Sequence, residues 1–243
     1  MVKTVAFADP KYLGDPVNAL RIFNTKEVDE IVILDITASE QGRQPDLGFV
    51  RELAGECFMP VSYGGGVRTV DQVEGLLRAG VEKVVVNTAF LNEPSLAADM
   101  ARSVGSQAVT GSIDVKKKRL GGHRVANTAS GVRVTGHDPL DWARRLEGEG
   151  VGEILLTSVD RDGTAAGYDL DLVGSIAGSL SVPVVACGGA GSHNDLRAVL
   201  QTGAAAAAGR LFVTHGRHLA SLVSYPAPDE VEAMANPTGM PSR

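Results

Sequence analysis

Short runs of apolar residues recur along the chain, and segments with helical periodicity separate them. The runs are nearly continuous in apolar residues, as is typical of strands buried on both faces of a parallel sheet. Helical patterns such as Val70–Ala79 and Leu140–Gly148 lie between them. Seven runs are expected to be strands: Ile31–Ile36, Met59–Tyr63, Lys83–Asn87, Gln107–Asp114, Glu153–Val159, Val182–Cys187 and Ala204–Gly209. This alternation predicts an α/β fold with a parallel sheet.

Two segments half a chain apart repeat each other. Pro60–Thr69 reads PVSYGGGVRT, and Pro183–Ser192 reads PVVACGGAGS. In each segment an apolar run is followed by glycines and then by a hydroxyl residue. That residue fits a capping box, which pairs Thr69 with Gln72 and Ser192 with Asp195. A glycine-rich turn between strand and helix presents backbone N–H groups to a phosphate. The repeat predicts a duplicated half-barrel with two phosphate sites, and a substrate with a phosphate at each end.

The number of strands is one short of a closed barrel, which has eight. Residues Met1–Arg21 are interpreted as a loop followed by a helix that starts near Asp15 and Pro16. The expected fold is therefore a (β/α)8 barrel whose first strand is missing, unless the count is wrong or the chain begins after its natural start. Residues 1–225 are expected to form this single barrel, and residues 226–243 a short helix near Asp229–Ala235 with a loose tail.

Composition narrows the class of protein. The 243 residues, 44% hydrophobic and 21% charged, suit one large globular domain. A net charge of −6 argues against nucleic acid as the main partner. Two cysteines suggest no disulfide framework, and the absence of a long apolar N-terminal segment predicts no signal peptide and no membrane span. We expect a cytoplasmic protein. The five histidines lack ligand spacing, so no metal or cofactor is expected.

Three aspartates follow apolar runs, at the strand ends where barrel enzymes carry their active sites. They are Asp35, Asp114 and Asp162. Such a carboxyl can act as a general acid–base if partial burial raises its pKa. The simpler interpretation is that each caps the loop or helix that follows. Asp114 is the strongest candidate, because it ends a long strand that no glycine-rich turn follows.

Two further groups of residues are candidates for function. Asn87, Thr88, Gly209 and Arg210 end the strands that follow the two glycine turns, and with the turn glycines they would complete two phosphate cradles; close packing of strand on helix would also explain the glycines. The glycines are Gly65, Gly66, Gly188 and Gly189.

At the opposite rim, charged residues stand at or just before strand starts: Glu30, Lys83 and Glu153. On their own, these three are interpreted as solvent-facing rather than as a salt-bridged gate. The basic run Lys116 to Arg119 before Gly121 and Gly122 is interpreted as a solvated hairpin turn.

These motifs together resemble the cyclase subunit of imidazole glycerol phosphate synthase, a glutamine amidotransferase of histidine biosynthesis. The resemblance runs from about Lys3 to Ser224, and its longest run is highly specific. The matching motifs are LDITAS at Leu34–Ser39, GGGVR at Gly64–Arg68, NTA at Asn87–Ala89, GSQ at Gly105–Gln107, ID at Ile113–Asp114 and GEILLTSVDRDGT at Gly152–Thr164. The resemblance implies a (β/α)8 barrel.

It also implies an activity and a partner. In that family a partner glutaminase releases ammonia, which passes through the barrel. The cyclase then adds it to a ribulosyl ketone and closes an imidazole ring, giving imidazole glycerol phosphate and AICAR. Asp114 matches one of two essential aspartates. The other implied matches are Gly66, Asn87 and Thr88 at one phosphate site, Asp162, Gly163 and Gly189 at the other, Asp35, Ser130 and Thr157 in the cavity, and Glu30, Lys83 and Glu153 in a charged gate to the ammonia channel. For the gate, the resemblance replaces the solvent-facing interpretation.

The chain also departs from that family. The second essential aspartate and the fourth gate residue, an arginine, lie on a first strand upstream of Lys3. Arg210 stands where a serine usually donates to phosphate, and Thr110 and Gly111 interrupt a strand that is usually rich in valine. The segments Lys3–Val5 and Phe23–Glu30 look more like a paralogous branch found with surface-polysaccharide genes, where ammonia is used to make an amidino or amino sugar.

Three functions remain open at this point. The first is the ammonia-dependent cyclase, which the two glycine cradles favour. The second is the sugar-amidating paralogue, and the third is a non-catalytic barrel that docks a glutaminase and conducts ammonia. Absence of the first-strand aspartate favours the second and third. A related phosphoribosyl isomerase is disfavoured, because it would not need the gate formed by Glu30, Lys83 and Glu153.

Overall fold

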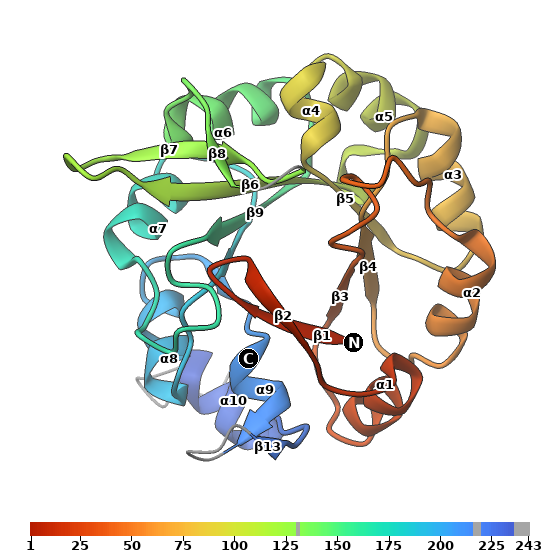
Figure 1. The fold of residues 1–243 in the computed structure, drawn as a ribbon, viewed down its shortest axis with the longest axis vertical. Coiled ribbons are helices and arrows are strands. Elements are labelled where there is room, and N and C mark those ends of the chain that lie inside the picture. Colours follow the sequence, from red (N-terminus) through yellow and green to blue (C-terminus); the bar gives the residue numbers. More distant parts are fainter. Residues whose placement is uncertain (130–131, 216–219, 236–243) are drawn as a thin grey trace, which may run out of the picture.

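A curled sheet of seven parallel strands forms the centre of the protein (Figure 1). The computed structural model describes residues 1–129, 132–215 and 220–235. In spatial order the strands are β11 (Ala205–Ala206), β10 (Val184–Cys187), β9 (Glu153–Ser158), β6 (Val109–Lys117), β5 (Lys83–Val86), β4 (Val61–Gly64) and β3 (Ile31–Leu34). Each overlaps one of the seven apolar runs, although β4 and β6 extend beyond the expected ends of theirs, and neighbours pair in parallel. The predicted α/β barrel class is confirmed.

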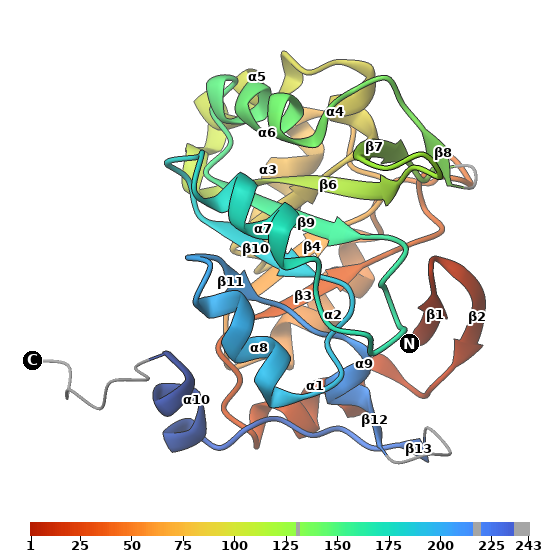
Figure 2. The ribbon, with the colours of Figure 1, turned by 90° about the vertical axis from the view of Figure 1, so that its left-hand side faces the viewer.

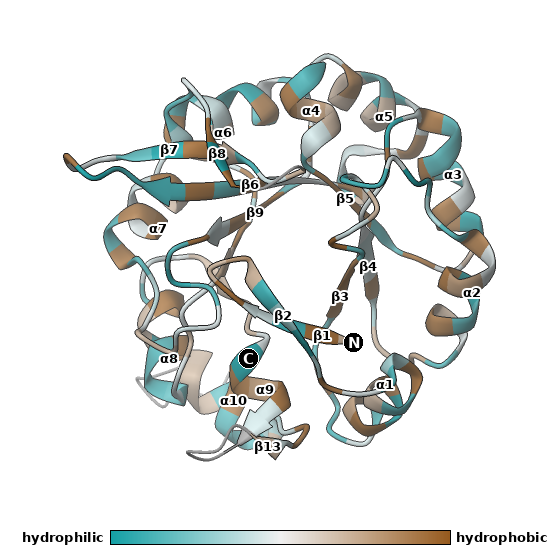
Figure 3. Ribbon diagram, in the orientation of Figure 1, coloured by the Kyte–Doolittle hydropathy of each residue, from teal (hydrophilic) through white to brown (hydrophobic). Residues whose placement is uncertain are grey.

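Helices surround the sheet, with their polar sides outward and the apolar strands inside (Figures 1 and 3). Both predicted capping boxes are present: Thr69 and Gln72 begin α3, and Ser192 and Asp195 begin α8. The helices are α1 (Pro16–Asn24), α2 (Leu47–Gly55), α3 (Val70–Arg78), α4 (Thr88–Asn92), α5 (Leu96–Val104), α6 (Pro139–Gly148), α7 (Leu170–Ala177), α8 (His193–Leu200), α9 (Arg210–Val213) and α10 (Pro228–Ala235), with a 3-10 turn at Ser106–Ala108. None of these helices is long and apolar enough to cross a membrane.

Alternate residues of each strand face the helices or the barrel interior. The outward residues belong to the hydrophobic core beneath the helices, and they are Val84, Val86, Val109, Ile113, Ile154 and Leu156. Gly111 has the same orientation, because a side chain there would meet Leu146 of α6. The residues between them, including Lys83, Thr110 and Asp114, therefore face inward.

The N-terminal residues form a hairpin instead of the expected loop. Strand β1 (Val2–Val5) pairs antiparallel with β2 (Ala8–Tyr12). The turn uses left-handed conformations at Ala6 and Phe7, where the sequence offers no glycine to signal it. Figure 2 shows the hairpin on the side to which the arrows of β6 and β9 point. The hairpin is not part of the main sheet, whose two ends in the described residues are β3 and β11.

A second hairpin extends β6 beyond the barrel. Strand β7 (His123–Asn127) pairs antiparallel with the end of β6, and β8 (Arg133–Val134) pairs with β7. The turn holds Gly121 and Gly122 at φ of 88° and 72°, which confirms the hairpin interpretation of the basic run. Asp114 was expected to end its strand, and this is wrong. The hairpin pairing carries β6 on to Lys117.

The C-terminal segment runs back past the start of β3. It contains β12 (Thr214–His215), β13 (Ala220–Ser221) and α10, whose Met234 is buried in the core. The Tyr225 hydroxyl donates a 2.6 Å hydrogen bond to Asp29, just before β3. This contact joins the C-terminal segment to the beginning of β3.

Candidate active site

Asp114 is the central carboxyl of the site. It lies on the inward face of β6, is 6% exposed, and accepts hydrogen bonds of 2.8 Å from the Asn87 amide and the Thr128 hydroxyl. Burial raises the pKa of Asp114 to about 6, although these two hydrogen bonds act to lower it and the charge of Asp162 raises it further. A carboxyl with this pKa can accept and return a proton near neutral pH.

Asp162 lies in the loop after β9, and the N-terminal hairpin contacts it. The Thr4 hydroxyl donates to its carboxylate at 3.2 Å, and the Ala6 N–H donates to its backbone carbonyl at 2.9 Å. Burial raises the pKa of Asp162, while Thr4 and the charge of Lys3 act to lower it. The charge of Asp162 acts on Asp114, so the two aspartates belong to one electrostatic site.

Asp35, the third predicted aspartate, is bound within its own loop. It accepts from the Thr37 and Ala38 N–H groups, from the Thr37 hydroxyl, and from Arg43 at 3.0 Å. Burial opposes ionisation, but the hydrogen bonds from Arg43 and Thr37 outweigh it and hold the pKa of Asp35 below its ordinary value. Asp35 is thus an ionised carboxylate that organises the β3–α2 loop, which agrees with the simpler capping interpretation.

The first glycine cradle, after β4, is closely packed against that loop. Gly65 and Gly66 have φ of 120° and 72°. A Cβ atom on Gly65 would lie 2.5 Å from the Asp35 carbonyl, and one on Gly66 would lie 2.5 Å from the Arg43 carbonyl. Packing alone therefore requires glycine at both positions. Asn87, at the N-terminus of α4, directs its side chain to Asp114, and Thr88 is the first residue of that helix.

The second cradle forms a small cavity. It is lined by Asp162, Gly163, Gly188, Gly189, Ala190, Ala208, Gly209 and Arg210. Arg210 reaches across it and donates to the Gly163 carbonyl at 2.6 Å. The Lys3 Nζ is buried nearby and has no hydrogen-bond partner among the described residues; burial and the charge of Arg210 lower its pKa. The fold thus brings together every residue that the sequence predicted for this end.

Of the two remaining predicted cavity residues, one belongs to the described part of the chain and the other does not. Thr157 lies on β9 directly beside Asp114 in the sheet register and is buried. Its neighbour on β10 is Cys187, whose thiol pKa burial raises to about 12. Ser130 lies outside the described residues.

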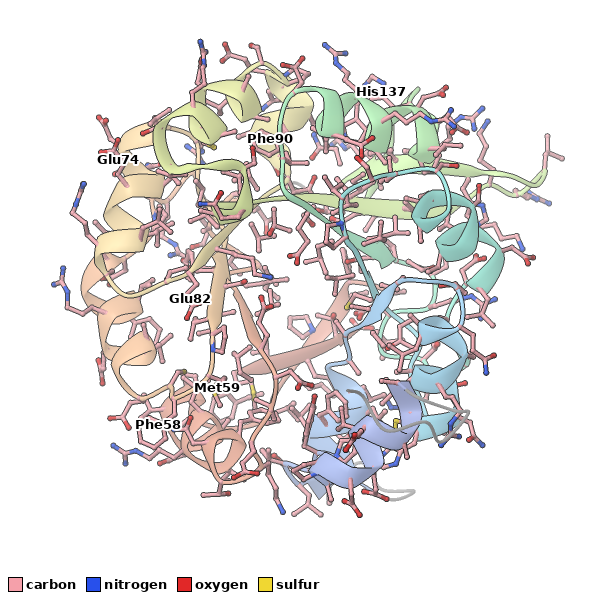
Figure 4. All side chains as sticks on the ribbon, turned by 180° about the vertical axis from the view of Figure 1, so that it is seen from behind. Phe58, Met59, Glu74, Glu82, Phe90 and His137 are labelled. Atoms are coloured by element: carbon pink, nitrogen blue, oxygen red, sulfur yellow. The ribbon has the colours of Figure 1, made fainter. Side chains whose placement is uncertain are left out.

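The three charged residues at the strand starts make one ion-paired ring. Lys83 donates to Glu30 and to Glu153, each at 2.8 Å. Burial disfavours the ammonium, but the hydrogen bonds to Glu153 and Glu30 outweigh it and raise the pKa of Lys83. Solvent-facing residues would not converge in this way, so the interpretation from the residues alone is wrong. Figure 4 views this side of the barrel, where the labelled Phe58, Met59 and Glu82 precede β4 and β5.

Sequence reasoning did not assign several residues to the site. Thr128, the second donor to Asp114, lies beyond β7 and reaches Asp114 only because β7 folds back on β6. Ser62 donates to Glu30 at 2.5 Å, and Thr110 donates to Glu153 at 3.0 Å. A hydroxyl at an inward strand position was the available signal for Ser62 and Thr110. Strand alternation alone does not say which face is inward.

Residues 1–218 match the family described as histidine biosynthesis protein. The chain belongs to this family. A Pseudomonas aeruginosa protein, named provisionally as imidazole glycerol phosphate synthase subunit hisF2, is 52% identical over 228 residues, covering 93% of this chain and 90% of that protein. An Alkaliphilus metalliredigens protein named imidazole glycerol phosphate synthase subunit HisF is 44% identical over 208 residues, covering 86% and 82%. A Vibrio vulnificus protein, named provisionally as subunit hisF3, is 41% identical over 232 residues, covering 95% and 89%.

Membership of the histidine biosynthesis protein family accounts for the barrel and for the motifs. The names of these relatives describe a subunit of a synthase, which agrees with the general cyclase role that the motifs imply.

Proposed function

We propose that this protein is the ammonia-using cyclase subunit of a glutamine amidotransferase of the imidazole glycerol phosphate synthase type. The observation that carries the proposal is Asp114, a buried carboxyl with a pKa of about 6, held by Asn87 and Thr128. It lies on the same inward strand face as Thr110, which contacts the ion-paired ring at the other end of the barrel. The beginning of β6, at the ion-paired ring, can thus admit ammonia, and Asp114 further along the strand can transfer protons.

The substrate supported by the site is an anion with a phosphate at each end. A buried Lys3 ammonium without a partner in the described chain, beside the Arg210 guanidinium, is stabilised when an anion enters the second cradle. The first cradle offers backbone N–H groups at a tight glycine turn. A phosphoribulosyl-formimino nucleotide has phosphates at both ends, and its ketone would meet ammonia near Asp114.

Asp114 is assigned the proton transfers at the reacting carbons. Addition of ammonia to the ketone requires a proton on the oxygen and the loss of one from nitrogen, after which the oxygen leaves as water. Attack of the new nitrogen on the formimino carbon closes the ring and breaks the bond to the aminoimidazole carboxamide nucleotide, whose departing amine takes up a proton. Asn87 and Thr128 orient the carboxyl, and burial excludes water from it. The source of ammonia is a partner glutaminase docked on the face that carries the ring, where Phe58 is 88% exposed.

The test is Asp114→Asn, which keeps size and polarity but removes the ionisable proton. Turnover of the ribulosyl nucleotide with ammonium should fall by roughly 10²–10⁴-fold. Formation of imidazole glycerol phosphate and AICAR is measured by chromatography. Asp71→Asn, an exposed aspartate of α3, is the matched control and should keep parental turnover. Turnover of Asp114→Asn within a few-fold of the parent would give Asp114 a structural role only.

Arg210 favours a second candidate, the paralogue that delivers ammonia to a sugar. Its guanidinium occupies the second cradle by its bond to Gly163, leaving less room for the ribulosyl phosphate. We expect Arg210→Ser to bind the ribulosyl nucleotide roughly tenfold more tightly than the parent, by calorimetric titration. Tight binding by the parent with no gain from serine would refute altered ligand choice and leave the histidine-pathway substrate.

A further inference from the structure

The inward face of β6 is polar along its whole length in the barrel. Thr110, Ser112 and Asp114 alternate with Val109, Gly111 and Ile113, which face the helices. Same-face residues of a strand are about 6.6 Å apart, so this line extends roughly 13 Å from the first to the last. Its beginning contacts the ion-paired ring, and its end is the acid–base carboxyl.

Thr110 is the link between the ring and this line. It is 1% exposed, and its hydroxyl donates to one oxygen of Glu153 while Lys83 donates to the other. A buried hydroxyl is costly unless it is hydrogen-bonded, so Thr110 and Glu153 depend on each other.

Ser112 continues the line at the middle of the barrel. Its neighbours there are apolar: Leu155 lies beside it on β9, and Val185 lies beside Leu155 on β10. Val85, the residue of β5 beside Thr110, is also apolar. Among these neighbouring strand positions, the polar groups therefore come from β6. Packing alone gives no reason for a hydroxyl at Ser112, where an apolar side chain would also fill the barrel.

We propose that Thr110 and Ser112 form a hydroxyl track that conducts ammonia from the ring to Asp114. Ammonia accepts one hydrogen bond and donates three, and a hydroxyl can both donate to it and accept from it. Each track residue replaces part of the hydration that ammonia loses in the barrel. The inference rests on the proposed function, because it gives the track its cargo and its destination.

The first experiment compares the parent with Thr110→Val, Ser112→Ala and the double variant, each in complex with its glutaminase. These substitutions keep the approximate shape and remove the hydroxyl. Glutamine-dependent turnover should fall roughly two- to tenfold for each lost hydrogen-bonding group, relative to turnover with saturating external ammonium. The KM for the acceptor should not change, because the acceptor does not touch the track. Thr202→Val, whose hydroxyl binds the Val199 carbonyl on α8, is the matched control and should change neither activity.

A second experiment tests the track without turnover. The protein labelled with nitrogen-15 is titrated with ammonium chloride at pH 9, where a large share of it is ammonia, against potassium chloride at equal ionic strength. Saturable shifts are expected at the amides of Thr110 and Ser112, and they should vanish in the double variant. If the parent complex shows no ammonium-dependent turnover, the proposed function is refuted. The titration would then still show whether Thr110 and Ser112 bind ammonia. The track is overturned if the double variant keeps the parental ratio of glutamine-dependent to ammonium-dependent turnover. Identical shifts with both salts also overturn it.

Discussion

Asp114 and Asp35 lie at the same rim of the barrel, and their surroundings give them opposite behaviour. Asp114 is buried, and its two donors are neutral groups, so burial prevails and its pKa rises to about 6. Asp35 meets the Arg43 guanidinium and several N–H donors, so its pKa falls below the ordinary value. Asp114 is suited to proton transfer, while Asp35 is suited to holding a loop.

This difference predicts opposite effects of pH on stability. Because the folded pKa of Asp114 is raised, its contribution to the free energy of unfolding is fully present below its unfolded pKa near 4. That contribution is lost as pH rises through 6. Asp114→Asn should therefore flatten the decline in stability between pH 4 and 7, by on the order of 2 kcal/mol. Urea unfolding of the parent and of Asp114→Asn at several pH values measures this difference in the free energy of unfolding.

Asp35→Asn is the matched control for that measurement. The folded pKa of Asp35 is lowered, so its contribution is present above its unfolded pKa and lost as pH falls through the folded value. Asp35→Asn should therefore lower the free energy of unfolding near neutral pH and have a smaller effect in acid. Parallel stability curves for the parent and Asp114→Asn would contradict the raised pKa of Asp114.

At the scale of elements, local chemistry predicts some features well and others not at all. The capping boxes of α3 and α8 were readable because each needs only a side chain and a backbone N–H three residues away. The basic hairpin was readable from Gly121 and Gly122, which allow a left-handed turn. The sequence does not predict the β1–β2 hairpin, because Ala6 and Phe7 adopt the same region without glycine. The Ala6 N–H donates to the Asp162 carbonyl, a contact that only the fold provides.

The glycine turns show a second limit at this scale. Their sequence predicts a phosphate cradle, yet the structure shows that packing also demands glycine. The Asp35 and Arg43 carbonyls approach the first turn, and the Ser158 and Gly167 carbonyls approach the second. A bulky substitution at Gly66 would thus disturb the β3–α2 loop whether or not phosphate binds. Variants of Arg210 give a cleaner test of ligand choice.

For the whole molecule, contacts between segments far apart in the chain are important. The hydrogen bond from Tyr225 to Asp29 joins the C-terminal segment to the start of β3. A donor to a carboxylate contributes about 1 kcal/mol when partly exposed. We expect Tyr225→Phe to lower the free energy of unfolding by about that amount.

Thermal and urea unfolding of Tyr225→Phe measure this contribution directly. Tyr12→Phe serves as the control, because Tyr12 is 75% exposed on β2 and its loss should change little. If the two variants unfold identically, the contact between Tyr225 and Asp29 does not stabilise the open sheet.

The sequence by itself determined the seven strands of the main sheet, the two capped turns and the choice of Asp114 as a candidate acid–base, because these depend on periodicity and on residues close in the chain. The tertiary structure alone decided which strand faces are inward. It also decided that Lys83 lies between Glu30 and Glu153, that Thr128 and Asn87 hold Asp114, and that Thr110 reaches Glu153. These pairs are 14 to 70 residues apart. Strand pairing in the parallel sheet and the β6–β7 hairpin bring such residues together, and burial there contributes to their pKa values.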